Sequence, residues 1–278
     1  NLFVEEDRRP QEAVAEASEA IAAAVDAISK RLSSGGRLFY LGAGTSGRLG
    51  VLDAAECPPT FCSDPELVQG VLAGGAPALL RSSEGLEDLE QAGRDDLDRH
   101  GFRQGDCLVG IAAGGTTPYV RGGLSYACSI GALAIAMACV PKDQAPLPCD
   151  IDIRLLTGPE LLTGSTRLKA GTATKMALNL LSTTVMVRLG KVYGNRMVDV
   201  AASNSKLVDR SLRILRDLIG IEREEGLALL ALSDGSVKLA LLMKAANLSK
   251  DQARSVLERH DQQLRPSLET CGATLAQL

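Results

Sequence analysis

The chain has 278 residues, of which 45% are hydrophobic and 23% are charged. This composition is typical of a globular protein and excludes a disordered chain. The 34 acidic residues outnumber the 30 basic ones, and aromatic residues make up only 3%. A general nucleic-acid-binding protein carries a basic excess or aromatic stacking platforms, so this class is excluded as well.

The cysteines and histidines indicate neither a disulfide framework nor a metal site. The seven cysteines form no CxxC pair, and His100 and His260 lie far apart. We therefore expect reduced thiols in a reducing compartment. No uncharged apolar stretch reaches the length of a transmembrane helix, and no signal peptide opens the chain, which predicts a cytoplasmic protein. Because the first residue is asparagine, we also expect that a segment precedes it.

The first two hundred residues alternate between strand and helix patterns. Short apolar runs predict strands at residues 37–41, 67–72, 107–112, 132–138 and 151–155. Helical spacing predicts helices at residues 10–34, 46–56, 87–99, 118–130 and 172–189. The second of these helices is predicted to end at Pro58-Pro59. Strands that alternate with helices predict a parallel sheet covered on both faces.

After about residue 205 the strand pattern stops. Short amphipathic helices are predicted at residues 206–218, 222–232, 235–246 and 249–258, with Ser249 as a cap. We therefore predict an α/β domain over residues 1–205 and a small all-helical domain over residues 206–278.

A glycine-rich loop, Gly42-Ala43-Gly44-Thr45-Ser46-Gly47, joins the first predicted strand to a helix. Glycines permit close backbone approach, and a helix N-terminus favours an anion. The loop has the spacing GxGxxG, but no acidic residue ends the next strand as in a dinucleotide site. The hydroxyl pair Thr45-Ser46 favours a single phosphate monoester. The alternative is a tight strand-to-helix turn without a ligand.

Two further segments have the same character. The strand at residues 107–112 is followed by Gly114-Gly115-Thr116-Thr117-Pro118, which also opens a helix. Two such loops at strand ends favour a ligand site at a switch point of the sheet. The segment Thr163 to Lys175 holds three cations and five hydroxyl groups. It is either a third anion site or a solvated linker whose hydroxyls cap the following helix.

Two groups of carboxylates are candidates for acid–base chemistry. Glu56 lies at the predicted end of a helix, where the helix dipole opposes a negative charge, and this suits a general acid. The run Glu84-Gly85-Leu86-Glu87-Asp88 surrounds a predicted helix start, where the dipole favours the ionised form. Spacing alone favours a surface role for each of these glutamates.

Four segments resemble those of one known family. The run from Leu41 to Thr60, LGAGTSGRLGVLDAAECPPT, resembles the signature of N-acetylmuramic acid 6-phosphate etherases. So do residues 84–88, 163–175 and 190–200, the last reading GKVYGNRMVDV. The similarity covers nearly the whole chain, including the helical C-terminal part. The glycine loop alone would indicate only the wider sugar isomerase (SIS) class of phosphosugar-binding domains.

The resemblance implies a flavodoxin-like three-layer α/β/α sandwich, a homodimer, and a lyase that needs neither metal nor cofactor. The family cleaves the ether between the sugar and D-lactate, giving N-acetylglucosamine 6-phosphate, in the recycling of bacterial peptidoglycan. In the ring-opened sugar, one carboxylate removes the proton on carbon 2, and a second carboxyl donates to the lactate oxygen on carbon 3. Water then adds to the unsaturated intermediate. The implied partners are the phosphorylated amino sugar and a second copy, with no nucleic acid and no membrane.

Carried over by motif, Glu56 in AECPP is the acid and Glu87 in EGLED is the base. The residues expected to hold the phosphate and the sugar are Thr45, Ser46, Gly47, Arg48, Gly115, Thr116, Thr117, Ser165, Thr166 and Lys169. Arg48 could equally be a structural partner on its helix.

One loop departs from the family pattern. The family commonly carries Ala-Ser-Gly-Arg-Thr-Pro, whereas this chain has Ala113-Gly114-Gly115-Thr116-Thr117-Pro118 and so lacks a serine hydroxyl and an arginine charge. Affinity or specificity for the sugar is therefore open. The strongest rival to the etherase is a non-catalytic sugar-phosphate sensor, as in the glucokinase regulatory proteins, although those carry two SIS domains and only one fits here. A third possibility is an aldose–ketose isomerase, which would leave the lactyl ether intact.

Overall fold

The structure is a computed structural model that describes residues 1–81, 85–200 and 205–276. It divides into two compact units, of which the first comprises residues 1–57 and 64–185 and the second residues 58–63 and 186–278.

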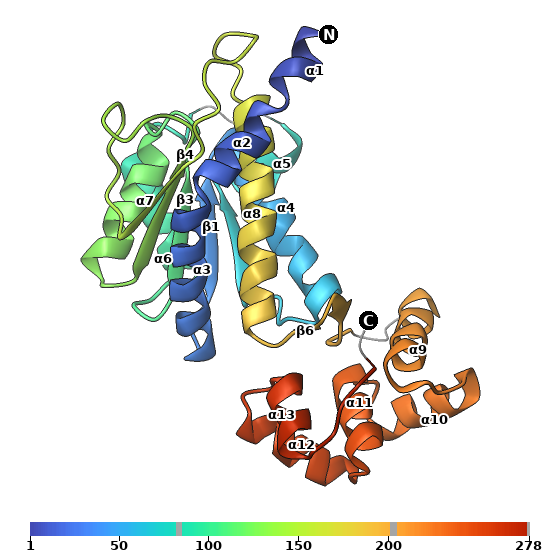
Figure 1. Cartoon of the computed structure of the whole chain (residues 1–278). Helices are drawn as coiled ribbons and strands as arrows, with labels where there is room; N and C mark the ends of the chain where they lie inside the picture. Colours follow the sequence, from blue (N-terminus) through green and yellow to red (C-terminus); the bar gives the residue numbers. More distant parts are fainter. Residues whose placement is uncertain (82–84, 201–204, 277–278) are drawn as a thin grey trace. The chain divides into compact units, whose positions relative to one another are not determined.

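The first unit is built on a five-stranded sheet in the order β2-β1-β3-β4-β5, with every neighbouring pair parallel (Figure 1). The strands are β1 Leu38–Gly42, β2 Val68–Leu72, β3 Cys107–Ile111, β4 Leu133–Ala138 and β5 Ile151–Arg154. Each predicted strand is confirmed to within about one residue. Every residue of β1, β3 and β4 is buried, as expected when helices cover both faces of a parallel sheet.

Helices cover the two faces and make the first unit a three-layer α/β/α sandwich, which confirms the predicted fold class. The helices are α1 Leu2–Glu6, α2 Arg9–Glu16, α3 Ser18–Ser33, α4 Gly44–Phe61, α5 Pro77–Leu80, α6 Glu90–Arg99, α7 Pro118–Ser129 and α8 Lys169–Arg188. Leu97 of α6 and Leu124 of α7 pack in one core with Phe39 of β1. Tyr40, the next residue of β1, points to the opposite face, where α3, α4 and α8 lie (Figure 1).

Four helices differ from the sequence-based expectation, one of them being α8, which begins at Lys169 rather than at residue 172. The helix expected over residues 10–34 is two helices, α2 and α3, that meet at Ala17. Helix α4 does not end at the proline pair but runs through it to Phe61. Proline φ is compatible with a helix, so the pair removes two hydrogen-bond donors without reversing the chain. Helix α6 begins at Glu90, so Glu87 lies in the turn before it.

The second unit contains a small hairpin and a group of helices. The hairpin strands are β6 Val192–Tyr193 and β7 Arg196–Met197, and the helices are α9 Ser205–Ile219, α10 Arg223–Leu232, α11 Val237–Ala246, α12 Lys250–Arg259 and α13 Leu264–Thr270. The four predicted helices are present, whereas the hairpin and α13 were not predicted. The compact units divide at residues 185–186 rather than at the predicted residue 205, because Val198 is fully buried in the core of the helical unit.

Ser249 caps α12 as predicted, since its hydroxyl accepts from the backbone N–H of Gln252 and the Gln252 side chain accepts from the backbone N–H of Ser249. Within the described ranges, no single helix is long and apolar enough to cross a membrane; α10 and α11 meet that length and composition only together, as a pair bent by 105°.

Candidate active site

The two glycine-rich loops lie side by side at the carboxyl edge of the sheet. Gly42, the last residue of β1, is in register with Ile111, the last residue of β3. The chain order reverses here, because β2 pairs with one side of β1 and β3 with the other. Such a switch point is where open α/β sheets bind ligands. The structure therefore brings together the first and second loops, as the sequence predicted.

In the first loop, the glycines are required by the turn itself. Gly44 has φ +52°, and a Cβ on Gly47 would lie 2.4 Å from the carbonyl oxygen of Gly42. Strand end and helix start therefore approach too closely for any side chain at Gly47. Thr45 and Ser46 are half-buried in the first turn of α4. The glycines thus serve the tight turn, while the hydroxyls are placed at a helix N-terminus that favours an anion.

The second loop positions Glu87. Gly115 has φ +69°, and a Cβ there would lie 2.7 Å from the Cβ of Ala145. Thr117 is the N-cap of α7, yet its side chain makes no capping hydrogen bond among the described residues. The backbone N–H of Tyr119, in the first turn of α7, donates to the carbonyl oxygen of Glu87 at 3.0 Å. Glu87 is therefore held beside the second loop.

Thr116 of the same loop is exposed, and Glu87 is half-buried. Glu84, the other glutamate of the EGLED motif, lies outside the described residues.

The third segment, residues 163–175, lies close to the first loop. Its backbone N–H groups and its lysine are bound by other residues of the same chain. A Cβ on Gly171 would lie 3.6 Å from the Thr45 methyl group. The Glu160 carboxylate accepts from the backbone N–H groups of Lys169 and Ala170, each at 3.0 Å, and so caps α8. The buried Lys169 ammonium is paired with Glu6 of α1. The Lys169 charge is thus paired with Glu6, and the N-terminus of α8 is capped by Glu160. Of the two hydroxyl residues expected to bind phosphate here, Ser165 is half-buried and Thr166 is exposed.

Arg48 has a structural partner. Its Nε donates to the carbonyl oxygen of Ala78 in α5 at 2.9 Å. This contact supports the structural alternative for Arg48, because it ties α4 to the segment after β2.

Asp53, which the sequence analysis did not single out, is the centre of a buried network. Its carboxylate accepts from the Tyr40 hydroxyl at 3.0 Å, from the Asn179 amide at 2.7 Å and from the Ser182 hydroxyl at 3.2 Å. The donors come from β1 and α8, so the network fixes how α4 is rotated about its axis. A sequence pattern could have indicated this aspartate, because Asp53 lies at helical spacing from Gly50 and Cys57. Both of these residues are buried in the structure.

That rotation turns Glu56 outward. Glu56 is exposed, whereas its neighbour Cys57 is buried and burial raises the pKa of the Cys57 thiol to about 12. The thiol therefore stays protonated at neutral pH. Helix α4 leads away from the carboxyl edge, so at 1.5 Å per residue Glu56 lies about 15 Å along the helix from Ser46.

The structure thus gathers most, but not all, of the predicted site. Thr45, Ser46, Gly115–Thr117 and Glu87 lie at the carboxyl edge, whereas Glu56 does not join them within one chain. The sequence analysis placed Glu56 at a helix end and the EGLED run around a helix start, and inferred opposite effects of the helix dipole on them. The observed positions weaken that inference. Glu56 is followed by five further residues of α4, and Glu87 precedes the first residue of α6 by three.

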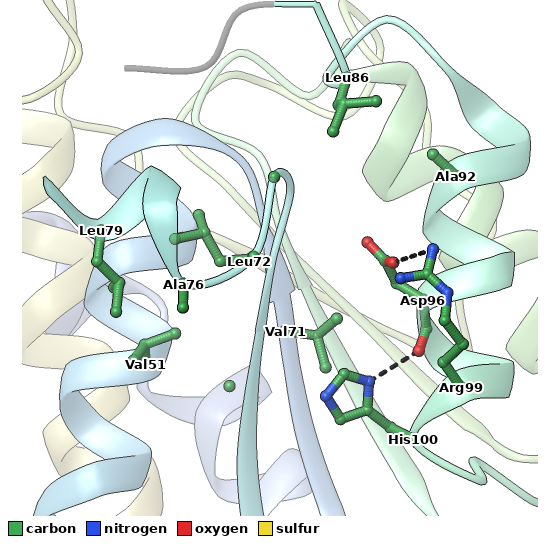
Figure 2. A pocket seen from close by; sticks show the side chains of 13 residues that line it. Val51, Val71, Leu72, Ala76, Leu79, Leu86, Ala92, Asp96, Arg99 and His100 are labelled. Atoms are coloured by element: carbon green, nitrogen blue, oxygen red, sulfur yellow. Dashed lines mark hydrogen bonds and ion pairs between the residues drawn. The ribbon is translucent and has the colours of Figure 1, made fainter. Parts of the chain in front are cut away.

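A cavity of about 480 Å³ opens along β2, between α4 and α6 (Figure 2). Val51 and Leu79 line one side, and Asp96, Arg99 and His100 line the other. Asp96 pairs with Arg99 at 2.6 Å and accepts from the Tyr119 hydroxyl at 2.6 Å. None of the described site residues lines this cavity, so it is separate from the loops at the carboxyl edge.

Comparisons with known proteins decide the family. The chain is 99% identical, over all of its length and 88% of the relative's, to the N-acetylmuramic acid 6-phosphate etherase of Synechococcus sp. strain CC9902. The chain belongs to the N-acetylmuramic acid 6-phosphate etherase family. The etherase of Synechocystis sp. is 60% identical over 97% of this chain and 88% of its own length.

Two further comparisons were made with this etherase-family chain. Residues 20–128 match the family model of the glucokinase regulatory protein N-terminal SIS domain. Among solved structures, a phosphoheptose isomerase from Neisseria gonorrhoeae is similar at 20% identity and a TM-score of 0.45, over 65% of this chain and 95% of that one.

Proposed function

We propose that this chain cleaves the D-lactyl ether of N-acetylmuramic acid 6-phosphate with water, giving N-acetylglucosamine 6-phosphate and D-lactate. The observation that supports the proposal is that Glu87 is bonded to the helix start after the second of two hydroxyl-bearing loops at the switch point, in a chain of the etherase family.

The phosphate is held at the carboxyl edge of the sheet. Thr45 and Ser46 at the start of α4 and Thr116 and Thr117 before α7 supply hydroxyl and backbone donors. The positive ends of both helices face the phosphate dianion. Ser165 and Thr166 complete the binding set, and binding of the phosphate competes with Glu6 for the Lys169 ammonium.

Elimination follows on the ring-opened sugar. The aldehyde on carbon 1 acidifies the proton on carbon 2, and the Glu87 carboxylate takes that proton. The bond between carbon 3 and the lactyl oxygen breaks, and protonated Glu56 gives its proton to the departing oxygen. The products are an aldehyde with a double bond between carbons 2 and 3, and D-lactate.

Hydration runs the same groups in reverse. Glu56, now a carboxylate, takes a proton from the water that adds to carbon 3. Glu87, now protonated, returns a proton to carbon 2. Both glutamates end in their starting states, so the cycle balances without a cofactor. General acid–base steps of this kind contribute about 10²–10⁴-fold to a rate.

The proposal extends to the setting of the reaction. The enzyme acts in the cytoplasm as a homodimer, in the recycling of peptidoglycan fragments, with no nucleic-acid or membrane partner. An acidic excess and scarce aromatic residues support the last point.

The test is D-lactate release from N-acetylmuramic acid 6-phosphate by the wild type, Glu56→Gln and Glu87→Gln. We expect release by the wild type and a fall of about 10²–10⁴-fold in each variant. Glu90→Gln is the matched control, because Glu90 is exposed and lies three residues after Glu87; it should keep the wild-type rate. Binding of the sugar phosphate without lactate release would point to a sensor instead. Conversion of the sugar with the lactyl ether intact would point to an isomerase.

A further inference from the structure

The helical unit holds a cavity that the proposed chemistry does not use. Its volume is about 380 Å³, and it is lined by residues 195–197 of the hairpin and by one side of α9. Cavities of about 300–1,000 Å³ are the size that small ligands occupy. All of its lining residues belong to the helical unit, and none of the described residues assigned to the sugar phosphate above is among them.

The charged residues of this cavity are mostly basic. Three arginines and one aspartate line it, namely Arg196, Arg210, Arg213 and Asp217. The lining therefore carries a net charge of +2, although the formal net charge of the chain is −4. Arg210, Arg213 and Asp217 follow one another at helical spacing on α9, and Arg196 comes from β7. Like charges gathered around one cavity repel one another, and a bound anion removes that repulsion.

The aspartate leaves a donor of Arg196 unused. Arg196 Nη2 donates to the Asp217 carboxylate at 2.9 Å, whereas the Arg196 Nε is buried without a hydrogen-bond partner among the described residues. Asp217 is also shared with Arg216, whose Nη2 lies 3.4 Å away. A full arginine–carboxylate pair uses two parallel N–H groups. The pair of Arg196 and Asp217 is therefore incomplete on the arginine side.

Arg210 and Arg213 have most of their donors available for a ligand. Within the described ranges, Arg210 makes no hydrogen bond and no ion pair, although it is half-buried. Arg213 bonds there only through its Nε, at 3.4 Å, to the carbonyl oxygen of Asp209 in the preceding turn of α9. A guanidinium that has lost part of its hydration gains most from an anionic partner.

The hairpin that carries Arg196 is fixed to the core of the helical unit. Val198, directly after β7, is fully buried in that core, and Tyr193 of β6 packs against it. The Arg265 guanidinium lies over the Tyr193 ring, 4.9 Å from its centroid. Arg196 is therefore held in place before a ligand binds, which lowers the entropy cost of binding.

We propose that this cavity, which we call the arginine pocket, binds a phosphate monoester of the size of a sugar phosphate. A phosphate monoester carries about 1.5 to 2 negative charges at pH 7, which matches the net charge of the lining. The planar guanidinium group binds phosphate oxygens through paired N–H groups, so the arginines hold the phosphate.

The rest of the lining suits the organic part of such a ligand. The Asn195 amide can exchange hydrogen bonds with hydroxyl groups, and Met197 and Ile214 offer apolar contact. The arginine pocket is a second phosphate site, distinct from the loops at the carboxyl edge of the sheet. It does not depend on the proposed function, because no catalytic step enters the argument.

Hydrogen–deuterium exchange with N-acetylglucosamine 6-phosphate tests the proposal. This probe has no lactyl ether, so it is not consumed. In the wild type we expect slower exchange at residues 192–197 and 205–219, which carry the pocket. Residues 42–47 report binding at the carboxyl edge in the same experiment. N-acetylglucosamine without phosphate should slow neither pocket segment, and inorganic phosphate should require a higher concentration because it has no organic part.

The variant Arg210→Gln/Arg213→Gln removes the two arginines that hold no other charged group. We expect the affinity at the pocket segments to fall by about tenfold or more, while the effect at residues 42–47 is unchanged. Arg259→Gln is the matched control, because Arg259 is exposed in the same unit and also donates its Nε to the carbonyl oxygen four residues earlier, at 3.3 Å. It should bind the probe as the wild type does.

Several results would overturn the proposal. These are unchanged exchange at residues 192–197 and 205–219 in the wild type at millimolar probe, equal slowing in the double variant, and equal slowing by N-acetylglucosamine. Equal affinity for inorganic phosphate would overturn the assignment of the organic part. Should the double variant fail to fold, Arg210→Gln alone gives the same test, because Arg210 makes no bond within the described ranges.

Discussion

Each compact unit holds an aspartate that several donors bind, Asp53 in the α/β unit and the half-buried Asp199 in the helical unit, and the donors differ in kind. Asp53 of the α/β unit accepts from three neutral donors, Tyr40, Asn179 and Ser182. Asp199 of the helical unit is bound by two ammonium groups, from Lys238 at 2.8 Å and Lys191 at 3.0 Å.

The difference shows two ways to hold elements together. The neutral donors around Asp53 act through the direction of their hydrogen bonds. They lie in β1 and α8, and so they fix the orientation of α4. The lysines around Asp199 act by charge, and burial lowers the pKa of Lys238 while the carboxylate opposes that shift. Lys238 also donates to the carbonyl oxygen of Gln262 at 3.0 Å, so the cluster ties α11 to the segment before α13. The network around Asp199 should therefore be sensitive to loss of charge, and the network around Asp53 to loss of hydrogen-bond geometry.

Asp199→Asn should have a large effect on stability. It leaves the buried Lys238 ammonium without its counter-charge, and breaking a buried ion pair on one side costs about 3–5 kcal/mol. Urea unfolding followed by circular dichroism measures the loss. Asp261→Asn, at an exposed position of the same unit, should change little. If the two variants were equally stable, the charge argument would fail.

Asp53→Ala should lower stability by a similar amount, and it should affect activity as well. Each buried donor left unpaired costs about 1–3 kcal/mol. Because the network sets the rotation of α4, we also expect a lower kcat for lactate release from the protein that remains folded. Asp53→Asn keeps the shape and part of the hydrogen bonding, and it should restore much of kcat. Asp143→Ala, at an exposed loop position, is the control. A stability loss with an unchanged kcat would remove the link between Asp53 and the site.

Tyr40→Phe should have the smallest effect, and that effect should depend on pH. At pH 8 the lost hydrogen bond costs about 1 kcal/mol. Burial, with the nearby Asp53 charge, raises the pKa of Tyr40 well above its usual value of 10.0. The folded state therefore keeps a proton that the unfolded chain loses above pH 10, and the free energy of unfolding falls with pH by about 1.4 kcal/mol per unit for one such group. The variant should be less stable than the wild type at pH 8 and no less stable at pH 11. A gap of the same size at both pH values would contradict this.

The sequence predicted the elements that depend on local patterns. Strands such as 107–112 are short apolar runs, and Ser249 is a cap with a glutamine at the required spacing, so both could be recognised without tertiary information. The path of α4 through Pro58 and Pro59 could not, because prolines usually end a helix and only the packing of the folded chain shows otherwise.

The positions of the two glycine-rich loops could be predicted from the sequence, whereas the positions of the two glutamates could not. The glycine loops meet because parallel strands end at one edge, which the order of elements implies. A backbone hydrogen bond from Tyr119 holds Glu87 beside the second loop, and no sequence pattern predicts this contact. The separation of Glu56 follows from the straight course of α4, and the engagement of Lys169 by Glu6 joins residues 163 positions apart. Both depend on the folded backbone.

The most direct test of the division between acid and base is the exchange of the proton on carbon 2 with deuterium from solvent. N-acetylmuramic acid 6-phosphate is incubated in D₂O with the wild type, Glu56→Gln or Glu87→Gln, and both deuterium incorporation and D-lactate release are followed. The account predicts that Glu56→Gln exchanges the proton without releasing lactate, because the base is intact and the acid is missing. It predicts that Glu87→Gln does neither. Exchange by Glu87→Gln, with none by Glu56→Gln, would contradict the assignment of Glu87 as the base.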